Sequence, residues 1–213
     1  MHFSKKDIQD LERIKRLNLV NSISGVKSAN LIGTLSSEGC TNLAIISSVV
    51  HLGSDPSLLG FIMRPDLKVR RHSYENILEN KSYTINHVTR SMVQNAHYTS
   101  AKFEADVSEF EMCALTEEYL FGHKAPFVKE SAIKMAMEFI EQIKIKANGT
   151  VLMIGALQDL VLPEKAMQET GHIDLDKVDA VGISGLNSYY ALEKMAQFPY
   201  ARVNELPNFN STK

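Results

Sequence analysis

The chain has 213 residues, 44% of them hydrophobic, and its formal net charge is −2. This charge gives no bulk attraction to nucleic acid or to anionic lipid, so we expect neither as a partner. The polar and charged start, residues 1–10, is unlike a secretory signal peptide, and no apolar run approaches the roughly 20 residues of a membrane helix. We therefore expect a cytoplasmic protein without a membrane segment, folded as one domain over residues 1–213.

The N-terminal part of the chain is predicted to contain one helix and three strands. Ser4 and Asp7 have the spacing of a capping box, and apolar residues recur after them at helical intervals, which predicts a helix over residues 4–17. Apolar stretches bounded by turn residues then predict three strands, over residues 29–35, 42–51 and 58–63.

The middle of the chain mixes helical and extended patterns. Ser73 is a suitable cap for a helix that ends near Asn80, and residues 82–88 are apolar enough for a strand. Residues 92–120 are predicted to form short helices and loops.

The most informative segment for the fold is residues 133–145. Its composition favours a helix, but its apolar side chains fall on alternate residues, which would place them on one face of a strand. Asn148-Gly149 follows, the dipeptide that suits a type I′ hairpin turn, and residues 150–162 form a second long strand. This hairpin predicts a mainly β protein. The chain is then predicted to close with a helix over residues 188–197, within a helical tail reaching residue 213.

Several site classes have no support in the sequence. There is no GxGxxG after a strand and no GxxxxGK[ST], and Ser184 lacks the spacing of a hydrolase nucleophile elbow. The seven histidines are scattered without HExxH or a tight cluster, so no metal site is predicted. Cys40 and Cys113 lie far apart without a CxxC partner and are expected to be reduced thiols, although the sequence leaves a disulfide between them open. No catalytic residue can be nominated.

One stretch, residues 42–76, has the residue types of an anion site. Small and hydroxyl residues in 42–48 would let a flat ligand lie close to the backbone. A basic group follows immediately before the predicted helix start at Ser73: Arg64, Lys68, Arg70, Arg71 and His72, interrupted by Asp66. Cationic donors, hydroxyls and free helix amides are what a phosphate requires. A solvated basic loop, with Ser47 and Ser48 satisfying strand-end backbone groups, is the alternative interpretation.

The order and spacing of several short motifs resemble the flavin reductase-like branch of the FMN-binding split β-barrel family. The resemblance covers residues 21–190 and rests on these segments: Asn42-Leu43-Ala44 with Ser47-Ser48, Phe61-Ile62-Met63-Arg64-Pro65, His72-Ser73, Asn76-Ile77, Thr99-Ser100-Ala101-Lys102-Phe103, Ser108-Glu109-Phe110, 125–131, Asn148-Gly149-Thr150 and 171–175. It implies a split β-barrel with peripheral helices. Ser73 stands where many members have Thr, which keeps the hydroxyl but not the methyl group.

The resemblance implies FMN as cofactor, held in a groove between the two protomers of a homodimer. The implied cofactor-binding residues are Asn42, Leu43, Ala44, Ile45, Ser47, Ser48, Arg64, Arg70, Arg71, His72, Ser73, Thr99, Ser100 and Lys102. Arg64, His72 and Ser73, with Arg70 or Arg71, would lie near the phosphate. NADH or NADPH would donate electrons, and the acceptor would be a partner oxygenase or a small molecule.

The implied activity is that of an NAD(P)H-dependent flavin reductase. Three other interpretations stay open. The protein could bind FMN without catalysis, as an electron carrier or store. It could be an oxidase of the pyridoxamine phosphate type, which would need further basic residues for a second phosphate. A β-barrel nucleic-acid module is disfavoured by the charge balance and by the absence of Trp.

Overall fold

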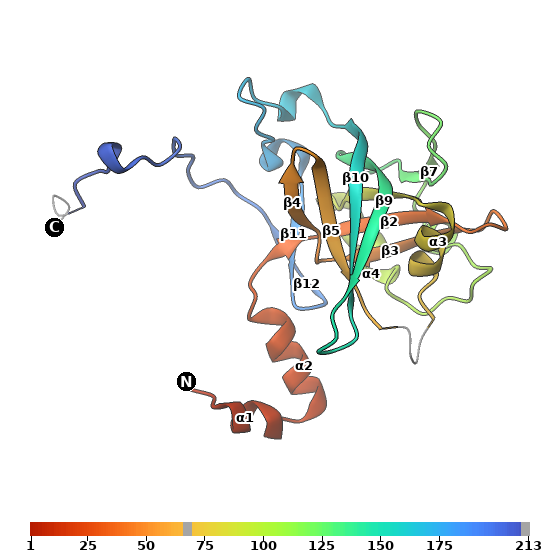
Figure 1. The fold of residues 1–213 in the computed structure, drawn as a ribbon, viewed down its shortest axis with the longest axis horizontal. Coiled ribbons are helices and arrows are strands. Elements are labelled where there is room, and N and C mark those ends of the chain that lie inside the picture. The colour runs from red at the N-terminus through yellow and green to blue at the C-terminus, as the bar shows by residue number, and fades with distance from the viewer. Residues whose placement is uncertain (66–69, 210–213) are drawn as a thin grey trace.

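A seven-stranded antiparallel sheet forms the body of the protein (Figure 1). The structure is a computed structural model that describes residues 1–65 and 70–209, so Asp66, Lys68 and the end of the predicted tail lie outside the described residues. The strand order is β3-β2-β6-β9-β10-β5-β4. These strands are β2 (Asn30–Leu35), β3 (Thr41–Ile46), β4 (Val50–Ser54), β5 (Ser57–Met63), β6 (Ser82–His87), β9 (Lys134–Lys144) and β10 (Val151–Val161).

The two end strands of the sheet, β3 and β4, meet at one point. These strands are consecutive in the chain but stand at opposite ends of the sheet, joined only by residues 47–49. At the junction the Ile62 amide donates to Ser48 Oγ at 3.0 Å, where a ladder bond would otherwise stand. The single strand predicted over residues 42–51 is therefore wrong. The chain must leave β2 to pair Val50 with Gly60 of β5, so it bends at the serines.

The predicted long hairpin is confirmed, since β9 pairs with β10 along its whole length. The predicted two-residue type I′ turn is wrong. The amide of Gly149 donates to the Ile145 carbonyl at 2.9 Å, which closes a four-residue turn in which Gly149 has a φ of 75°. The alternate apolar residues of 133–145 share a buried face only in the half of β9 near the body. The register shifts after Ile154, and Ile143 near the turn is 49% exposed.

Two hydrophobic clusters use opposite faces of β2. Ile32 packs with residues inside the barrel such as Tyr83 and Met137. Leu31 packs instead into an outer cluster with Leu43, over which the chain after β6 lies. Because both faces are covered, β2 is almost entirely buried. The edge strand β3 is thereby held against the body through its Leu43 side.

The helices lie around the sheet and are short. They are α1 (Lys5–Asp10), α2 (Arg13–Ser22), α3 (His72–Asn80), α4 (Val93–Tyr98), α5 (Glu109–Met112) and the 3₁₀ turns η1 (Arg90–Met92), η2 (Glu164–Ala166), η3 (Leu175–Val178) and η4 (Val203–Glu205). The Ser4 capping box is confirmed. The single helix over residues 4–17 is wrong, because the Glu12 carboxylate accepts from the amides of Ile14 and Lys15 and starts a second helix. No helix of the described chain is long and apolar enough to cross a membrane.

A small three-stranded sheet lies beside the body, in the order β1-β11-β12. Its strands are β1 (Lys27–Ser28), β11 (Val181–Ser184) and β12 (Ser188–Ala191). The helix predicted over residues 188–197 is therefore wrong. Ser188–Ala191 turns back after Gly185, with a φ of 64°, and pairs with the edge that β11 offers. Among the described residues 192–209 of the predicted helical tail, only η4 is helical. The two cysteines are both free thiols, as expected.

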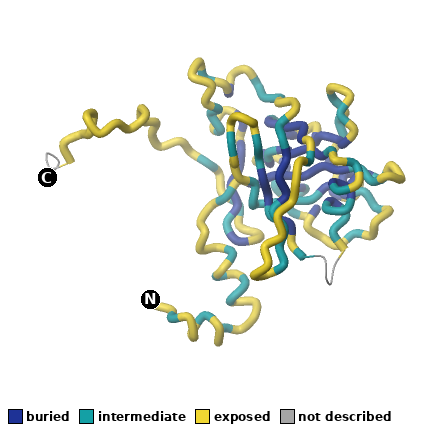
Figure 2. The backbone as a smooth tube through the Cα atoms, viewed as in Figure 1, coloured by how far each residue is buried: buried dark blue, intermediate teal, exposed yellow. Residues whose placement is uncertain are grey.

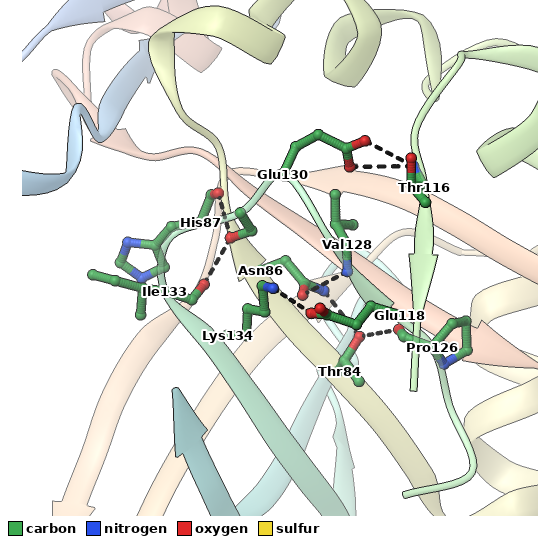
Figure 3. Close-up of polar contacts among 11 residues, drawn as sticks. Thr84, Asn86, His87, Thr116, Glu118, Pro126, Val128, Glu130, Ile133 and Lys134 are labelled. Carbon is green, nitrogen blue, oxygen red and sulfur yellow. Dashed lines mark hydrogen bonds and ion pairs between the residues drawn. The ribbon is translucent and has the colours of Figure 1, made fainter. Parts of the chain in front are cut away.

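A buried polar network fastens the segment from residue 116 to residue 134 to the end of β6 (Figure 3). The segment contains the two short strands β7 (Glu117–Glu118) and β8 (Phe127–Val128). Thr84 Oγ1 donates to the Pro126 carbonyl at 2.7 Å, and the Val128 amide donates to Asn86 Oδ1 at 3.0 Å. Lys134, buried at the start of β9, pairs with Glu118. These polar links add to the apolar packing of Phe127 and Val128, whose side chains are fully buried.

Gly33 leaves the space that this network requires. A Cβ atom there would lie 2.3 Å from the Pro126 carbonyl oxygen and 2.5 Å from Thr84 Oγ1. Gly33→Ala should therefore lower the free energy of unfolding by about 1–3 kcal/mol, as overpacking does. Urea unfolding measures the change, with Ser37→Ala in the exposed β2–β3 turn as the control. Equal stability of the two variants would contradict the close approach.

Candidate functional site

A cavity of about 640 Å³ lies where the end of β3, the chain after β5, the start of α3 and the chain after α4 come together. This is within the range of about 300–1,000 Å³ that is usual for ligand pockets. All of the predicted site residues except Leu43 line it. The lining comprises Asn42, Ala44, Ile45, Ile46, Ser47, Ser48, Ile62, Met63, Arg64, Arg70, Arg71, His72, Ser73, Thr99, Ser100, Ala101, Lys102, Phe103, Glu104, Ala105, Glu109, Ile183 and Leu186. Segments far apart in sequence thus form one wall.

The start of α3 contributes backbone donors to the cavity. The helix begins at His72, and Arg71 in the cap position makes no side-chain cap hydrogen bond, so Ser73 is not the cap that the sequence predicts. Arginine is a poor capping residue, and an uncapped first turn leaves amides for an external acceptor. Ser73 instead is buried and its hydroxyl accepts from Asn42 Nδ2 at 2.8 Å. This helix end has the chemistry of an anion site.

The three arginines of the cavity differ in what they contact. Arg70 forms an ion pair with Glu75, with 2.8 Å between Nε and Oε2. Arg71 is half-buried at the cap of α3, and Arg64 is exposed at the end of β5. The pairing with Glu75 partly neutralises Arg70, so less of its charge is available to an anion.

Two side chains seal the outer edge of β3. The Leu43 amide donates to Glu109 Oε2 at 2.9 Å, and the Ile45 amide donates to Thr99 Oγ1 at 3.0 Å. The Leu43 side chain is fully buried in the outer cluster. Backbone donors for a ligand must therefore come from the bend after β3, at Ser47 and Ser48. The hydroxyl of Ser48 already accepts from Ile62, which supports the structural interpretation of that side chain.

The chain after α4 places the second predicted segment on the rim. Thr99 is buried and its hydroxyl donates to the Ala96 carbonyl at 2.8 Å. Ser100 donates to the His97 carbonyl at 2.7 Å, and Lys102 is exposed. Of these three side chains, Lys102 retains the greatest freedom to contact a ligand.

Glu109 is a site residue that sequence reasoning did not nominate. It lies at the start of α5, is 6% exposed and lines the cavity. Burial raises the pKa of this carboxyl, while the hydrogen bond from the Leu43 amide opposes the rise. Its segment, Ser108-Glu109-Phe110, carried part of the family resemblance, but nothing local in the sequence distinguishes a buried glutamate from an exposed one.

Apolar side chains complete the wall. Ile46, Ile62, Phe103 and Leu186 stand among the polar residues of the lining. An apolar wall with basic groups and helix amides at one side suits a flat ligand that carries an anionic tail. Within the described residues, no group of three His, Cys, Asp or Glu could hold a metal ion.

Comparison with known proteins adds to this geometry. The family model of the flavin reductase like domain matches residues 26–177. The structure is similar to that of a candidate flavin reductase with a split barrel domain from Shewanella frigidimarina NCIMB 400. The two chains share 49% sequence identity, with a TM-score of 0.91 over 94% of this chain and all of that one. The predicted mainly β split barrel is thereby confirmed.

More distant structures share the fold. Nitrilotriacetate monooxygenase component B from Bacillus cereus is 18% identical, with a TM-score of 0.81 over 93% of this chain and 98% of that one. An FMN-binding protein from Thermus thermophilus, solved with bound 1-cyclohex-2-enone, is 14% identical, with a TM-score of 0.66 over 82% and 91% of the chains.

The buried Glu109 predicts a pH-dependent stability difference. Because burial raises the pKa of Glu109 above its ordinary value of 4.5, the folded state holds this proton more tightly than the unfolded state. The stabilisation from the protonated form is full below pH 4.5 and is lost as the pH rises through the folded-state pKa. Glu109→Gln keeps an acceptor for the Leu43 amide without the charge. It should therefore be more stable than the wild type at pH 8, with the difference shrinking toward pH 4 in urea unfolding.

The control for this prediction is Glu109→Ala. It leaves the buried Leu43 amide without an acceptor, so it should lose about 1–3 kcal/mol at both pH values. A Glu109→Gln protein that is less stable than the wild type at pH 8 would show that the carboxylate is stabilising there.

Proposed function

We propose, from the premise that this chain belongs to the flavin reductase like family, that it binds FMN in the described cavity and reduces it with NADH or NADPH. The observation that carries the proposal is the convergence of the end of β3, Arg64, the uncapped start of α3 and the Thr99 segment on one cavity. These segments would supply a phosphate site, backbone donors and an apolar wall within the same space. Flavin-related oxidoreductase chemistry is the activity that family membership supports.

The phosphate would bind at the basic side of the cavity. Arg64 and Arg71 would supply charge-assisted donors, and the amides of His72 and Ser73 would act with them. Arg70 would contribute less because Glu75 competes for it. Each hydrogen bond to a charged group contributes roughly 1.5–3 kcal/mol, so a few such bonds are enough to anchor the cofactor.

The remaining predicted residues would hold the ribityl chain and the ring. Asn42 and Ala44 present side chains on the cavity face of β3, and Ser47 and Ser48 offer the amides of the bend. Thr99, Ser100 and Lys102 would line the opposite rim. Leu43 and Ile45 would act indirectly, since their amides fix Glu109 and Thr99.

Bound FMN would supply a ring that accepts hydride, and the protein would supply binding, orientation and field. Hydride transfer requires no protein acid or base, so this chemistry needs no catalytic triad. The polar bend at Ser47 and Ser48 would fix one edge of the ring, and the apolar side chains Ile46 and Ile62 would exclude water from it.

We further propose a homodimer with two equivalent sites, and a partner oxygenase or small molecule as the acceptor. Closed twofold assemblies are the commonest oligomers. The similarity to a protein named as component B of a monooxygenase supports an oxygenase acceptor. A cytoplasmic location is expected from the sequence.

The proposal predicts that purified protein is yellow or becomes so with FMN, and that it oxidises NADH or NADPH. The absorbance of the reduced nicotinamide should decrease much faster with the protein than with free FMN alone. Flavin fluorescence should show a saturable change at micromolar FMN. Binding without any added oxidation of either nucleotide would assign the protein to electron carriage, and no binding would remove the proposal.

The phosphate site predicts a selective loss in Arg64→Ala. This variant should weaken FMN about tenfold to hundredfold while riboflavin, which lacks the phosphate, changes little. Fluorescence titration with both flavins measures the difference, which high salt should reduce if the site is open to solvent.

Arg70→Ala is the matched control, because it removes the same charge from a residue that Glu75 already engages. Its effect on FMN should be smaller than that of Arg64→Ala. Equal weakening of FMN and riboflavin by Arg64→Ala would instead assign Arg64 to the ring or to the fold.

A further inference from the structure

The C-terminal segment is tied to the body at one point and then leaves it. Lys194 Nζ donates to Asp174 Oδ1 at 2.9 Å, and the Lys194 amide donates to Asp176 Oδ2 at 3.1 Å. The side-chain amides of Gln168 and Gln197 bond to each other at 3.2 and 3.4 Å. Residues 198–209, here named the C-terminal arm, then extend away from the barrel (Figure 1).

The arm is apolar but uncovered. Its large side chains are mostly exposed: Phe198 at 84%, Tyr200 at 85%, Val203 at 90%, Leu206 at 62% and Phe209 at 75%. The tube in Figure 2 is coloured as exposed along this whole segment. Segments that stay disordered are poor in aromatic residues because these drive burial. The aromatic content of the arm therefore indicates that these side chains are buried against another surface.

The N-terminal helices are uncovered in the same way and leave from the same side. Neither α1 nor α2 contains a buried residue, and Ile14, Val20 and Ile23 are 48–72% exposed. The chain after α2 forms β1, which pairs with β11, and the arm follows β12. In Figure 1 the helices and the arm both extend from the side of the barrel where β11 and β12 lie. Both segments therefore present apolar side chains that the described chain leaves uncovered.

A second copy of the chain could bury these side chains in an interface of ordinary size. Buried aromatic side chains contribute about 150–250 Å² each, so two exchanged arms with three aromatics each supply on the order of 1,000 Å². With the other apolar side chains this approaches the 1,200–2,000 Å² of a specific protein–protein interface. At about 3.3 Å per residue the arm reaches about 40 Å, which is enough to cross onto a neighbouring protomer.

We propose that the C-terminal arm packs on a second copy of this chain, each protomer embracing its partner. The inference rests on the homodimer of the proposed function and identifies the segment that holds it together. It also connects the dimer with the site, because Ile183 and Leu186 of the β11–β12 hairpin line the cavity. An interface over this small sheet brings the partner to the rim of the cavity.

A photo-cross-linker tests where the arm lies. Benzoylphenylalanine in place of Tyr200 should give, after irradiation, a covalent dimer on a denaturing gel. The same group in place of Tyr119, which is 53% exposed near β7, is the control and should stay at monomer mass. Cross-linking at position 200 that yields only monomer-mass product would show that the arm folds onto its own protomer, and would overturn the proposal.

A second measurement asks whether the arm contributes to association. The triple variant Phe198→Ser, Tyr200→Ser and Val203→Ser should raise the dimer dissociation constant at least a hundredfold by light scattering. Arg202→Ala with Glu205→Ala, which breaks the ion pair within the arm, is the polar control and should change it less than tenfold. An unchanged dimer in the triple variant would also overturn the proposal.

Both measurements use protein without added flavin, and FMN titration is carried out separately. Cross-linked dimers without FMN binding would reject the proposed function and leave the arm exchange standing. FMN binding by a protein whose arm gives no intermolecular product would do the reverse.

Discussion

Three residues connect β3 to β4, although these strands stand at opposite ends of the sheet. Such a link spans at most about 14 Å, so the sheet must curl until its two ends meet. The bond from the Ile62 amide to Ser48 Oγ marks the meeting point. Because β5 lies beside this junction, its end carries Arg64 to the same place. The meeting of the two sheet ends thus also brings these walls of the cavity together.

The second constraint is the open edge of β3. An unpaired strand edge exposes amides that would pair with another chain, and proteins cover such edges. Here the side chains of Glu109 and Thr99 take the place of a neighbouring strand. These bonds also fix the position of the chain after α4 and of α5 relative to the barrel. This arrangement places a buried carboxyl in the wall of the cavity, whereas a serine or threonine at position 109 would carry no charge.

Alternation in residues 133–145 predicted the long hairpin because a side-chain period of two is a property of the strand itself. The basic group around Arg64 could be predicted from the sequence because its members are close together in the chain. The strand Ser188–Ala191 was not visible, since it forms only where β11 offers an edge. Glu109 escaped notice for the same reason. Its burial depends on Leu43, 66 residues away, and no local pattern encodes that contact.

The two charged parts of the cavity act on an anionic ligand in opposite directions. Arg64 and the start of α3 favour an anion, whereas the carboxyl of Glu109 disfavours one in the part of the wall that it forms. Protonation of Glu109, which burial favours by raising the pKa of this carboxyl, would remove this repulsion. These two parts lie close together, because Asn42 bonds to Ser73 at the start of α3 and the adjacent Leu43 amide bonds to Glu109. An anion at the helix start would therefore experience both the attraction of Arg64 and the repulsion of the Glu109 carboxylate. Through this carboxyl, the affinity of the cavity for an anionic ligand is coupled to pH.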